Sequence, residues 1–279
     1  MSTTHTSTAG IDARPNGGRA GLLALQTLTQ LRSSLRTADF AVGAVVIPVL
    51  LYAMFGLPNA SSRLPGGTAV GAAMLVSLTA YGVVSLAVFV FGEDVAKERG
   101  RGWVRTLRAT PLPTSVYLVG KAGAALVHGA LIVLAMSVLA AVAGNVDLPV
   151  RTWLLLGAVQ LAGVLVFSPL GFAIAYLARP RAATVVANVI FLPLAFASGF
   201  FVPLGELPAV LGDIAQVLPT CHFGQLAYRL VMPEGDIAYW TGATVAPVAV
   251  NLAWVVGSAV VLGSLALLAA RREAVTRRG

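Results

Sequence analysis

Charged residues are scarce in this sequence. Asp, Glu, Lys and Arg make up only 11% of its 279 residues, whereas a soluble domain has about 25%. Hydrophobic residues account for 57%, and there are 29 glycines besides, while the apolar share of soluble domains, glycine included, is only about 45–50%. With so little polar surface to face water, one or two soluble globular domains are excluded. The composition places the chain in a membrane.

Motifs for nucleotide or catalytic chemistry are also missing. The sequence contains no GxxxxGK[ST] phosphate-binding loop and no HExxH metal motif. Its long apolar stretches hold one basic or acidic residue, His128, which we interpret as an interhelical hydrogen-bonding residue. The single cysteine, Cys221, excludes an intrachain disulfide. We therefore expect neither an enzyme nor a metal or cofactor site, and energy for uphill transport would have to come from another polypeptide.

Stretches without Asp, Glu, Lys or Arg predict the membrane spans. A hydrocarbon core about 30 Å thick requires about 20 helical residues, and continuous apolar runs favour helices over a barrel. We predict an all-α polytopic protein of six transmembrane helices, within 40–62, 64–92, 122–146, 152–178, 182–205 and 237–270. A shorter stretch, 214–228, predicts an outer re-entrant or surface helix between spans five and six.

Basic residues predict the orientation. Alternating the sides of the six spans places 16 of the 19 Lys and Arg residues on one side, and only Arg63, Arg151 and Arg229 on the other. Because cytoplasmic loops are enriched in Lys and Arg, we expect both termini in the cytoplasm and the protein in the plasma membrane. This topology accounts for the net charge of +8 without nucleic acid as a partner.

The segments outside the lipid complete the expected organisation. Residues 1–19 predict a disordered cytoplasmic arm, 20–37 an interfacial helix, 38–270 the six-helix domain and 271–279 a cytoplasmic tail. The helix of 20–37 is amphipathic, because five of its apolar residues share an arc of about 120°: Ala24, Leu25, Leu28, Leu31 and Leu35. The alternative is that it is only the frayed start of the first span.

The stretch between spans two and three, 93–113, is the most informative part of the chain. Gly100 and Gly102 predict the end of the descending helix, and two prolines, Pro111 and Pro113, separate the loop from span three. A short helix from about Arg101 to Thr110 would carry arginines on one face and Trp103 with Leu107 on the other. It is either a basic loop lying on anionic lipid or a coupling helix that docks a cytoplasmic partner.

Three groups of residues resemble a known family: Ile47-Pro48 in the first span, the run from Lys97-Glu98-Arg99 to Leu107, Thr110-Pro111 and Gly120-Lys121, and the outer elbow of Gly199 to Pro203, Leu207-Pro208 and Leu218-Pro219. With six spans, the chain from about Leu22 to Arg272 resembles the permease subunit of type 2 ATP-binding-cassette exporters, a family that includes antibiotic and multidrug efflux permeases. The resemblance implies a homodimer, or a pair with a similar permease, in the lipid bilayer on two cytoplasmic ATPase subunits. The implied ATPase-coupling residues are Glu98, Arg101, Trp103, Arg105, Leu107 and Arg108.

The resemblance also implies a substrate path near spans two and five. These spans offer an apolar surface with scattered polar groups, formed by Ser77, Tyr81, Ser85, Asn188, Phe191 and Phe196. Such a surface suits a hydrophobic or amphipathic drug-like cargo better than an ion. Export of a glycolipid or polysaccharide, or a role as a non-transporting membrane scaffold, remain alternatives.

Overall fold

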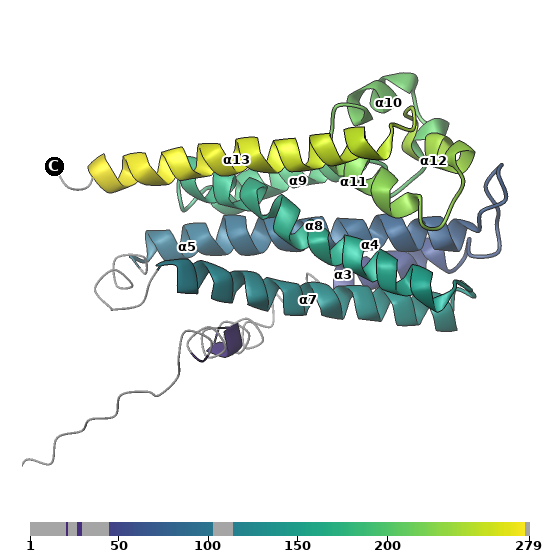
Figure 1. The fold of residues 1–279 in the computed structure, drawn as a ribbon, viewed down its shortest axis with the longest axis horizontal. Helices are drawn as coiled ribbons and strands as arrows, with labels where there is room; N and C mark the ends of the chain where they lie inside the picture. The colour runs from purple at the N-terminus through teal and green to yellow at the C-terminus, as the bar shows by residue number, and fades with distance from the viewer. Residues whose placement is uncertain (1–20, 22–26, 30–44, 103–113, 277–279) are drawn as a thin grey trace, which may run out of the picture.

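The computed structural model describes residues 21, 27–29, 45–102 and 114–276, and this part of the chain is almost entirely helical (Figure 1). Its α-helices are α3 (Ile47–Leu51), α4 (Val70–Val88), α5 (Val95–Gly100), α7 (Thr114–Val142), α8 (Val150–Leu177), α9 (Ala183–Ala197), α10 (Ala209–Ala215), α11 (Pro219–Tyr228), α12 (Glu234–Thr241) and α13 (Val248–Thr276). Two π-helical turns, η2 (Tyr52–Gly56) and η3 (Phe89–Asp94), and a 3-10 turn, η4 (Leu204–Glu206), complete the set.

Helix α4 is the centre of the bundle. Of the apolar segment in the continuous helix Val70–Gly100, 83% is buried, whereas the corresponding value for α13 is 11%. Small residues let neighbouring helices approach α4 closely; for example, a Cβ on Gly82 would lie 2.8 Å from Cγ of Pro48 on α3 and 3.0 Å from Ile132 on α7. The bundle is therefore assembled around α4, with α13 along its outside (Figure 1).

Four helices in the described residues are long and apolar enough to cross a membrane: Val70–Gly100, Val116–Val142, Val150–Leu177 and Val248–Arg272. They correspond to four of the six predicted spans. The other two predicted spans contain shorter apolar helices, Ile47–Gly56 and Ala183–Ala197. A membrane-spanning helical bundle is thus confirmed, whereas six spans stay a prediction.

The predicted boundaries were wrong between spans five and six. The stretch 214–228 is not one helix: α10 ends at Ala215, and α11 begins at Pro219. Proline fits the first turn of a helix but lacks the N–H needed inside one. Likewise the last span begins at Val248 rather than 237, because α12 ends at Thr241 and is followed by Gly242, whose backbone is left-handed (φ 60°). Absence of charge did not distinguish one long helix from two separated ones.

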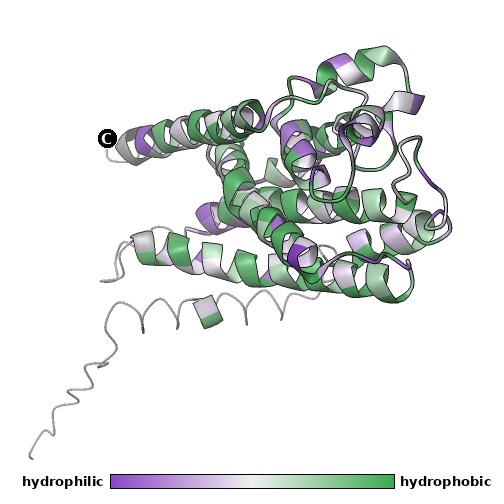
Figure 2. Ribbon diagram, turned by 45° about the vertical axis from the view of Figure 1, so that its right-hand side comes forward, coloured by the Kyte–Doolittle hydropathy of each residue, from purple (hydrophilic) through white to green (hydrophobic). Residues whose placement is uncertain are grey.

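The helices α10, α11 and α12 form a cap over one end of the bundle. Figure 2 shows that hydrophilic residues are concentrated in this cap and at the helix ends, whereas the long helices are mostly hydrophobic. Asp236 in α12 is fully buried and accepts hydrogen bonds from the backbone amides of Gly66 (2.6 Å) and Thr68 (3.0 Å). The indole of Trp240 donates to the carbonyl of Gly199 (3.0 Å). The cap is therefore fastened to the turns before α4 and after α9.

The predicted interfacial helix, 20–37, lies largely outside the described residues. In its described part Gly21 and residues 27–29 are helical. The Thr27 hydroxyl lies 3.0 Å from the position that a Cβ on Gly123 would take. Residues 27–29 thus pack beside the first half of α7.

Candidate functional site

The end of the bundle opposite the cap carries charged residues, and we call it the basic end. One continuous helix leads to it from the cap side. Helix α4 passes through η3 into α5, which ends at Gly100 as predicted. The π-helical turn lies where Gly92 crosses α8 at Gly171, and a Cβ on Gly92 would lie 3.3 Å from the Gly171 carbonyl oxygen. Such turns are rare and are often found at functional sites.

Three residues at the basic end form a compact polar group, the Glu98 cluster: Glu98 from α5, and Tyr117 and Lys121 from α7. The Lys121 ammonium lies 2.8 Å from Oε1 of Glu98, and the Tyr117 hydroxyl donates to Oε2. Lys121 also lies over the Tyr117 ring, 5.7 Å from its centroid. Because Lys121 is only 3% exposed, the Glu98 carboxylate compensates a charge that would be costly to bury alone. The cluster therefore fixes the end of α5 against α7.

Arg99 makes the matching attachment to α8. Its guanidinium donates to the carbonyl of Ala175 and lies over the ring of Tyr176, 5.2 Å from the centroid. Glu98 and Arg99, which are adjacent in α5, thus bind two different helices, α7 and α8. An i,i+4 pair between Lys97 and Glu93 (2.5 Å) lies on the same helix, but the Lys97 side chain is half-exposed, so it contributes little to stability.

The predicted coupling residues are only partly described. Glu98 lies in the cluster, and Arg101 is exposed in the turn after α5, followed by Gly102 in a left-handed conformation (φ 77°). Trp103, Arg105, Leu107 and Arg108 fall outside the described residues, as does most of the predicted coupling helix, which stays a prediction.

Sequence reasoning did not assign the partners of Glu98. Tyr117 and Lys121 are one helical turn apart at the start of an otherwise apolar span, and this spacing places them on one face. A lysine within the first turns of a spanning helix is a signal of a buried partner. The identity of that partner depended on the contact between α5 and α7, which the sequence did not reveal.

Near the middle of α4, an aromatic cluster joins the predicted substrate-path helices. Tyr81 lies 5.2 Å from Phe191 on α9 and 5.0 Å from Phe201, measured between ring centroids. Phe191 also contacts Phe89 (5.8 Å), and Phe201 contacts Phe196 (4.5 Å). Spacings of 4.5–7 Å are favourable for aromatic pairs. The structure thus brings together Tyr81, Phe191 and Phe196, and adds Phe89 and Phe201, which were not predicted.

The polar members of the predicted path do not join this cluster. Ser77 and Ser85 are buried and donate to carbonyls of their own helix, at Met74 (3.2 Å) and Gly82 (2.8 Å). Asn188 is exposed on α9 and donates to the Thr184 carbonyl. In the single chain these hydroxyl and amide groups donate hydrogen bonds to backbone carbonyls of their own helices, as such residues commonly do in apolar helices.

Other single residues noted in the sequence are also buried. The His128 Nδ1 atom lies 2.8 Å from the Ala124 carbonyl one turn earlier. Cys221 is a free thiol, 1% exposed. Within the described residues no group of three His, Cys, Asp or Glu side chains is placed to hold a metal ion.

Comparison with known proteins gives two matches. Residues 66–268, more than half of the chain, match the family described as ABC-2 family transporter protein. A protein of Bacillus subtilis (strain 168) named "Putative transport permease YvfS" is 28% identical over 211 residues, which cover 75% of this chain and 85% of that protein. The family match includes α4, the Glu98 cluster, the aromatic cluster and the cap.

Proposed function

Since the chain belongs to the ABC-2 family of transporter proteins, we propose that it is the permease subunit of an exporter driven by a separate cytoplasmic ATPase. The proposal has a simple energetic basis: the chain has no phosphate-binding loop of its own. A motor on another polypeptide must then act through a surface of this one. The basic end is the proposed surface, and the orientation that places it in the cytoplasm follows from the Lys and Arg distribution.

The observation that carries the proposal is the Glu98 cluster. It anchors α5 immediately before the segment 101–113, so a push on that segment would be transmitted to α7 through Glu98 and to α8 through Arg99. Because α5 continues without a break into α4, the same push would also reach the centre of the bundle. We propose that ATP-driven closure of the partner subunits acts through this segment to switch the permease between inward-open and outward-open states.

We further propose that the permease works as a pair and exports hydrophobic or amphipathic drug-like compounds. Helix α9 supports this, because it presents the exposed apolar side chains of Val185 and Val189 together with Phe196, the exposed member of the aromatic cluster. A second copy covering this face would leave an aromatic, weakly polar seam. Such a seam suits a lipophilic cargo, since burial of apolar area is the main source of its affinity.

The test is ATP-dependent transport of a lipophilic fluorescent dye by inverted vesicles that contain the chain and its ATPase. Trp103→Ala and Leu107→Ala should lower uptake more than about tenfold, because truncating one of the few anchor residues that dominate an interface costs about 2 kcal/mol or more. Thr106→Ala, on the same segment, is the matched control and should leave uptake near the unmodified level.

Membrane insertion and ATPase co-purification are measured on the same samples. Normal insertion with lost ATPase binding supports the coupling role. Full uptake in both variants would contradict it, and no ATP-dependent uptake of any cargo by the unmodified chain would favour a scaffold. Uptake of a glycolipid but not of the dye would contradict only the cargo assignment.

A further inference from the structure

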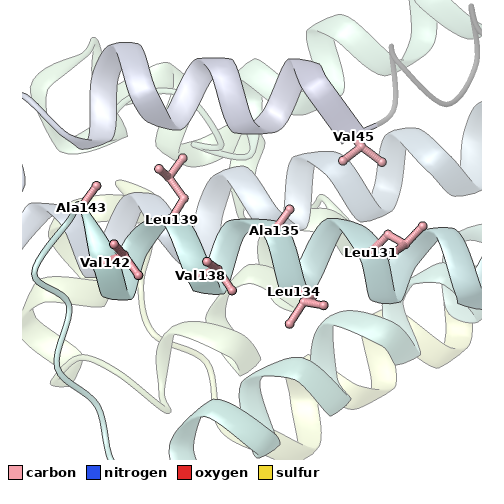
Figure 3. A pocket seen from close by; sticks show the side chains of 8 residues that line it. All are labelled: Val45, Leu131, Leu134, Ala135, Val138, Leu139, Val142 and Ala143. Atoms are coloured by element: carbon pink, nitrogen blue, oxygen red, sulfur yellow. The ribbon is translucent and has the colours of Figure 1, made fainter.

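Helix α7 carries an aliphatic groove beside α3, with a volume of about 540 Å³. Figure 3 shows its lining side chains along α7, with Val45 at one end from the neighbouring helix. The full lining is Val45, Leu131, Leu134, Ala135, Val138, Leu139, Val142 and Ala143. Every one of these side chains is a hydrocarbon, so the groove offers no partner for a polar ligand.

The groove arises from the spacing of small residues on α7. Residues four apart form a ridge on a helix surface, and one such ridge alternates Leu131, Ala135, Leu139 and Ala143. The two alanines leave hollows beside the parallel ridge of Leu134, Val138 and Val142. That second ridge is 52–78% exposed, so the groove opens outward from the bundle.

Beside the groove, α7 packs against the helix Ile47–Gly56 and against α4. Pro48 and Ile132 are buried and both pack at Gly82 of α4, and the Tyr52 hydroxyl lies 2.6 Å from the position that a Cβ on Gly144 would take. Thr27 contacts α7 at Gly123, two turns before Leu131. These contacts hold α7, the helix that carries the groove, against its described neighbours.

Its dimensions match one lipid leaflet. The groove follows α7 over the twelve steps from Leu131 to Ala143, which at 1.5 Å per residue is about 18 Å, and half of a 30 Å hydrocarbon core is about 15 Å. Because α7 is long and apolar enough to cross the membrane, its exposed ridge of Leu134, Val138 and Val142 is suited to face hydrocarbon. The groove lies in the half of α7 nearer the cap.

We infer that this groove binds one acyl chain of a phospholipid from the leaflet on the cap side, and holds it more tightly than the surrounding fluid lipid. The inference rests on the placement of α7 in the membrane and is independent of the ATPase partnership. A concave aliphatic wall contacts a chain on several sides, whereas a convex helix surface contacts it on one, so more dispersion contacts are made per methylene.

The test uses a phosphatidylcholine that carries a photoreactive diazirine in one acyl chain. The full chain is reconstituted in vesicles containing this lipid, extracted into lipid-free detergent, washed and then irradiated, so that only retained lipid reacts. Mass spectrometry of peptides should find at least about fivefold more adduct on residues 131–143 than on the exposed α13 residues 256–261, a ratio equivalent to about 1 kcal/mol. This measurement on the unmodified chain decides the question even if a variant fails to fold.

Ala135→Phe fills the groove and should remove most of that adduct. Val260→Phe, at a 62% exposed position on α13, adds a ring outside the groove and should leave it unchanged; Ala135→Leu is a milder filling variant. Equal labelling of α7 and α13, or full labelling of α7 after filling, would overturn the proposal. So would a disulfide between two copies at Val138→Cys in the absence of adduct, because the groove would then be a contact between chains.

Discussion

Gly92 and Gly171 pack backbone against backbone where the central helix crosses α8. A Cβ on Gly171 would lie 2.6 Å from the carbonyl oxygen of Ala87 and 2.9 Å from the amide nitrogen of Gly92. Neither of these two atoms can move away through a change of side-chain rotamer, because both belong to the main chain. Along the central helix this crossing lies between Phe89 of the aromatic cluster and Glu98, and it fixes the distance between that helix and α8.

Replacing Gly171 by Ala should therefore separate α8 from the central helix. We expect a loss of about 1–3 kcal/mol in the free energy of unfolding, the usual cost of inserting a methyl group into a close-packed interior, seen as a lower midpoint of thermal unfolding in detergent. Gly257→Ala is the matched control, because nothing lies within 4 Å of the added Cβ in α13. It should be neutral or stabilising by up to about 1 kcal/mol; equal destabilisation by both substitutions would contradict the close approach.

The Glu98 cluster predicts a non-additive pair of substitutions. Glu98→Gln leaves the Lys121 charge buried without its carboxylate, and we expect it to destabilise the chain by about 3 kcal/mol. Adding Lys121→Met should restore much of the loss, because the buried charge is then gone. Thermal unfolding of both single variants and the double variant measures this coupling. A double variant as unstable as the sum of the two would show that the residues act independently.

The sequence predicted where the apolar helices lie more reliably than where they end. Continuous runs without charge identified the segments of α4, α7, α8 and α13, because lipid requires a long helix with its backbone bonded internally. Boundaries failed at Pro219 and Gly242, where the chain turns inside an uncharged stretch. Composition constrains what lies in lipid, but the backbone geometry of single prolines and glycines decides how it is divided.

The contacts at the basic end were not predicted, for a similar reason. Glu98 was implied as a coupling residue by the resemblance of the loop, but its partners Lys121 and Tyr117 come from another helix and Arg99 reaches a backbone carbonyl. Such contacts depend on which helices are neighbours. Tyr81 and Phe191 were predicted on two spans near one seam, and the contact with Phe201 across the turn after α9 was not.

Asp236 predicts a pH dependence of stability. Its burial tends to raise its pKa, but hydrogen bonds from Thr68 and from the Gly66 backbone outweigh burial and hold the pKa below its ordinary value of 3.8. Because the folded state then binds this proton less readily than the unfolded state, the contribution of Asp236 is complete above about pH 4 and is lost as the pH falls below it.

Asp236→Asn should lower stability at neutral pH by about 1.5–3 kcal/mol, because a charge-assisted acceptor of two backbone amides is replaced. The variant should also lose less stability than the unmodified chain when the pH is lowered from 5 to 3. Glu234→Gln on the same helix, whose side chain is 71% exposed, is the control and should change neutral stability little. Unfolding midpoints measured across this range check both expectations.

The aromatic cluster predicts different outcomes for two phenylalanines on one helix. Phe191 is 3% exposed and contacts both Tyr81 and Phe89, whereas Phe196 is 52% exposed. Phe191→Ala should cost about 3–5 kcal/mol, the range for a buried ring. Phe196→Ala should cost less than about 1 kcal/mol in the single chain and instead weaken dye transport. A Phe196 variant that unfolds as readily as the Phe191 variant would contradict the exposure of this ring.

The π-helical turn η3 has a consequence for everything that follows it. It holds one residue more than the α-helical turn it replaces, and each residue advances a helix by about 100°. The side chains of the helix from Val70 to Gly100 therefore follow one angular register before this turn and another after it. The first register directs side chains into the bundle, and the second directs Glu98 toward Lys121. Deleting a single residue within Phe89–Asp94 would give the whole helix one register and rotate Glu98 about the helix axis by about a quarter-turn. Glu98 would then point away from Lys121, although every side chain of the cluster would still be present.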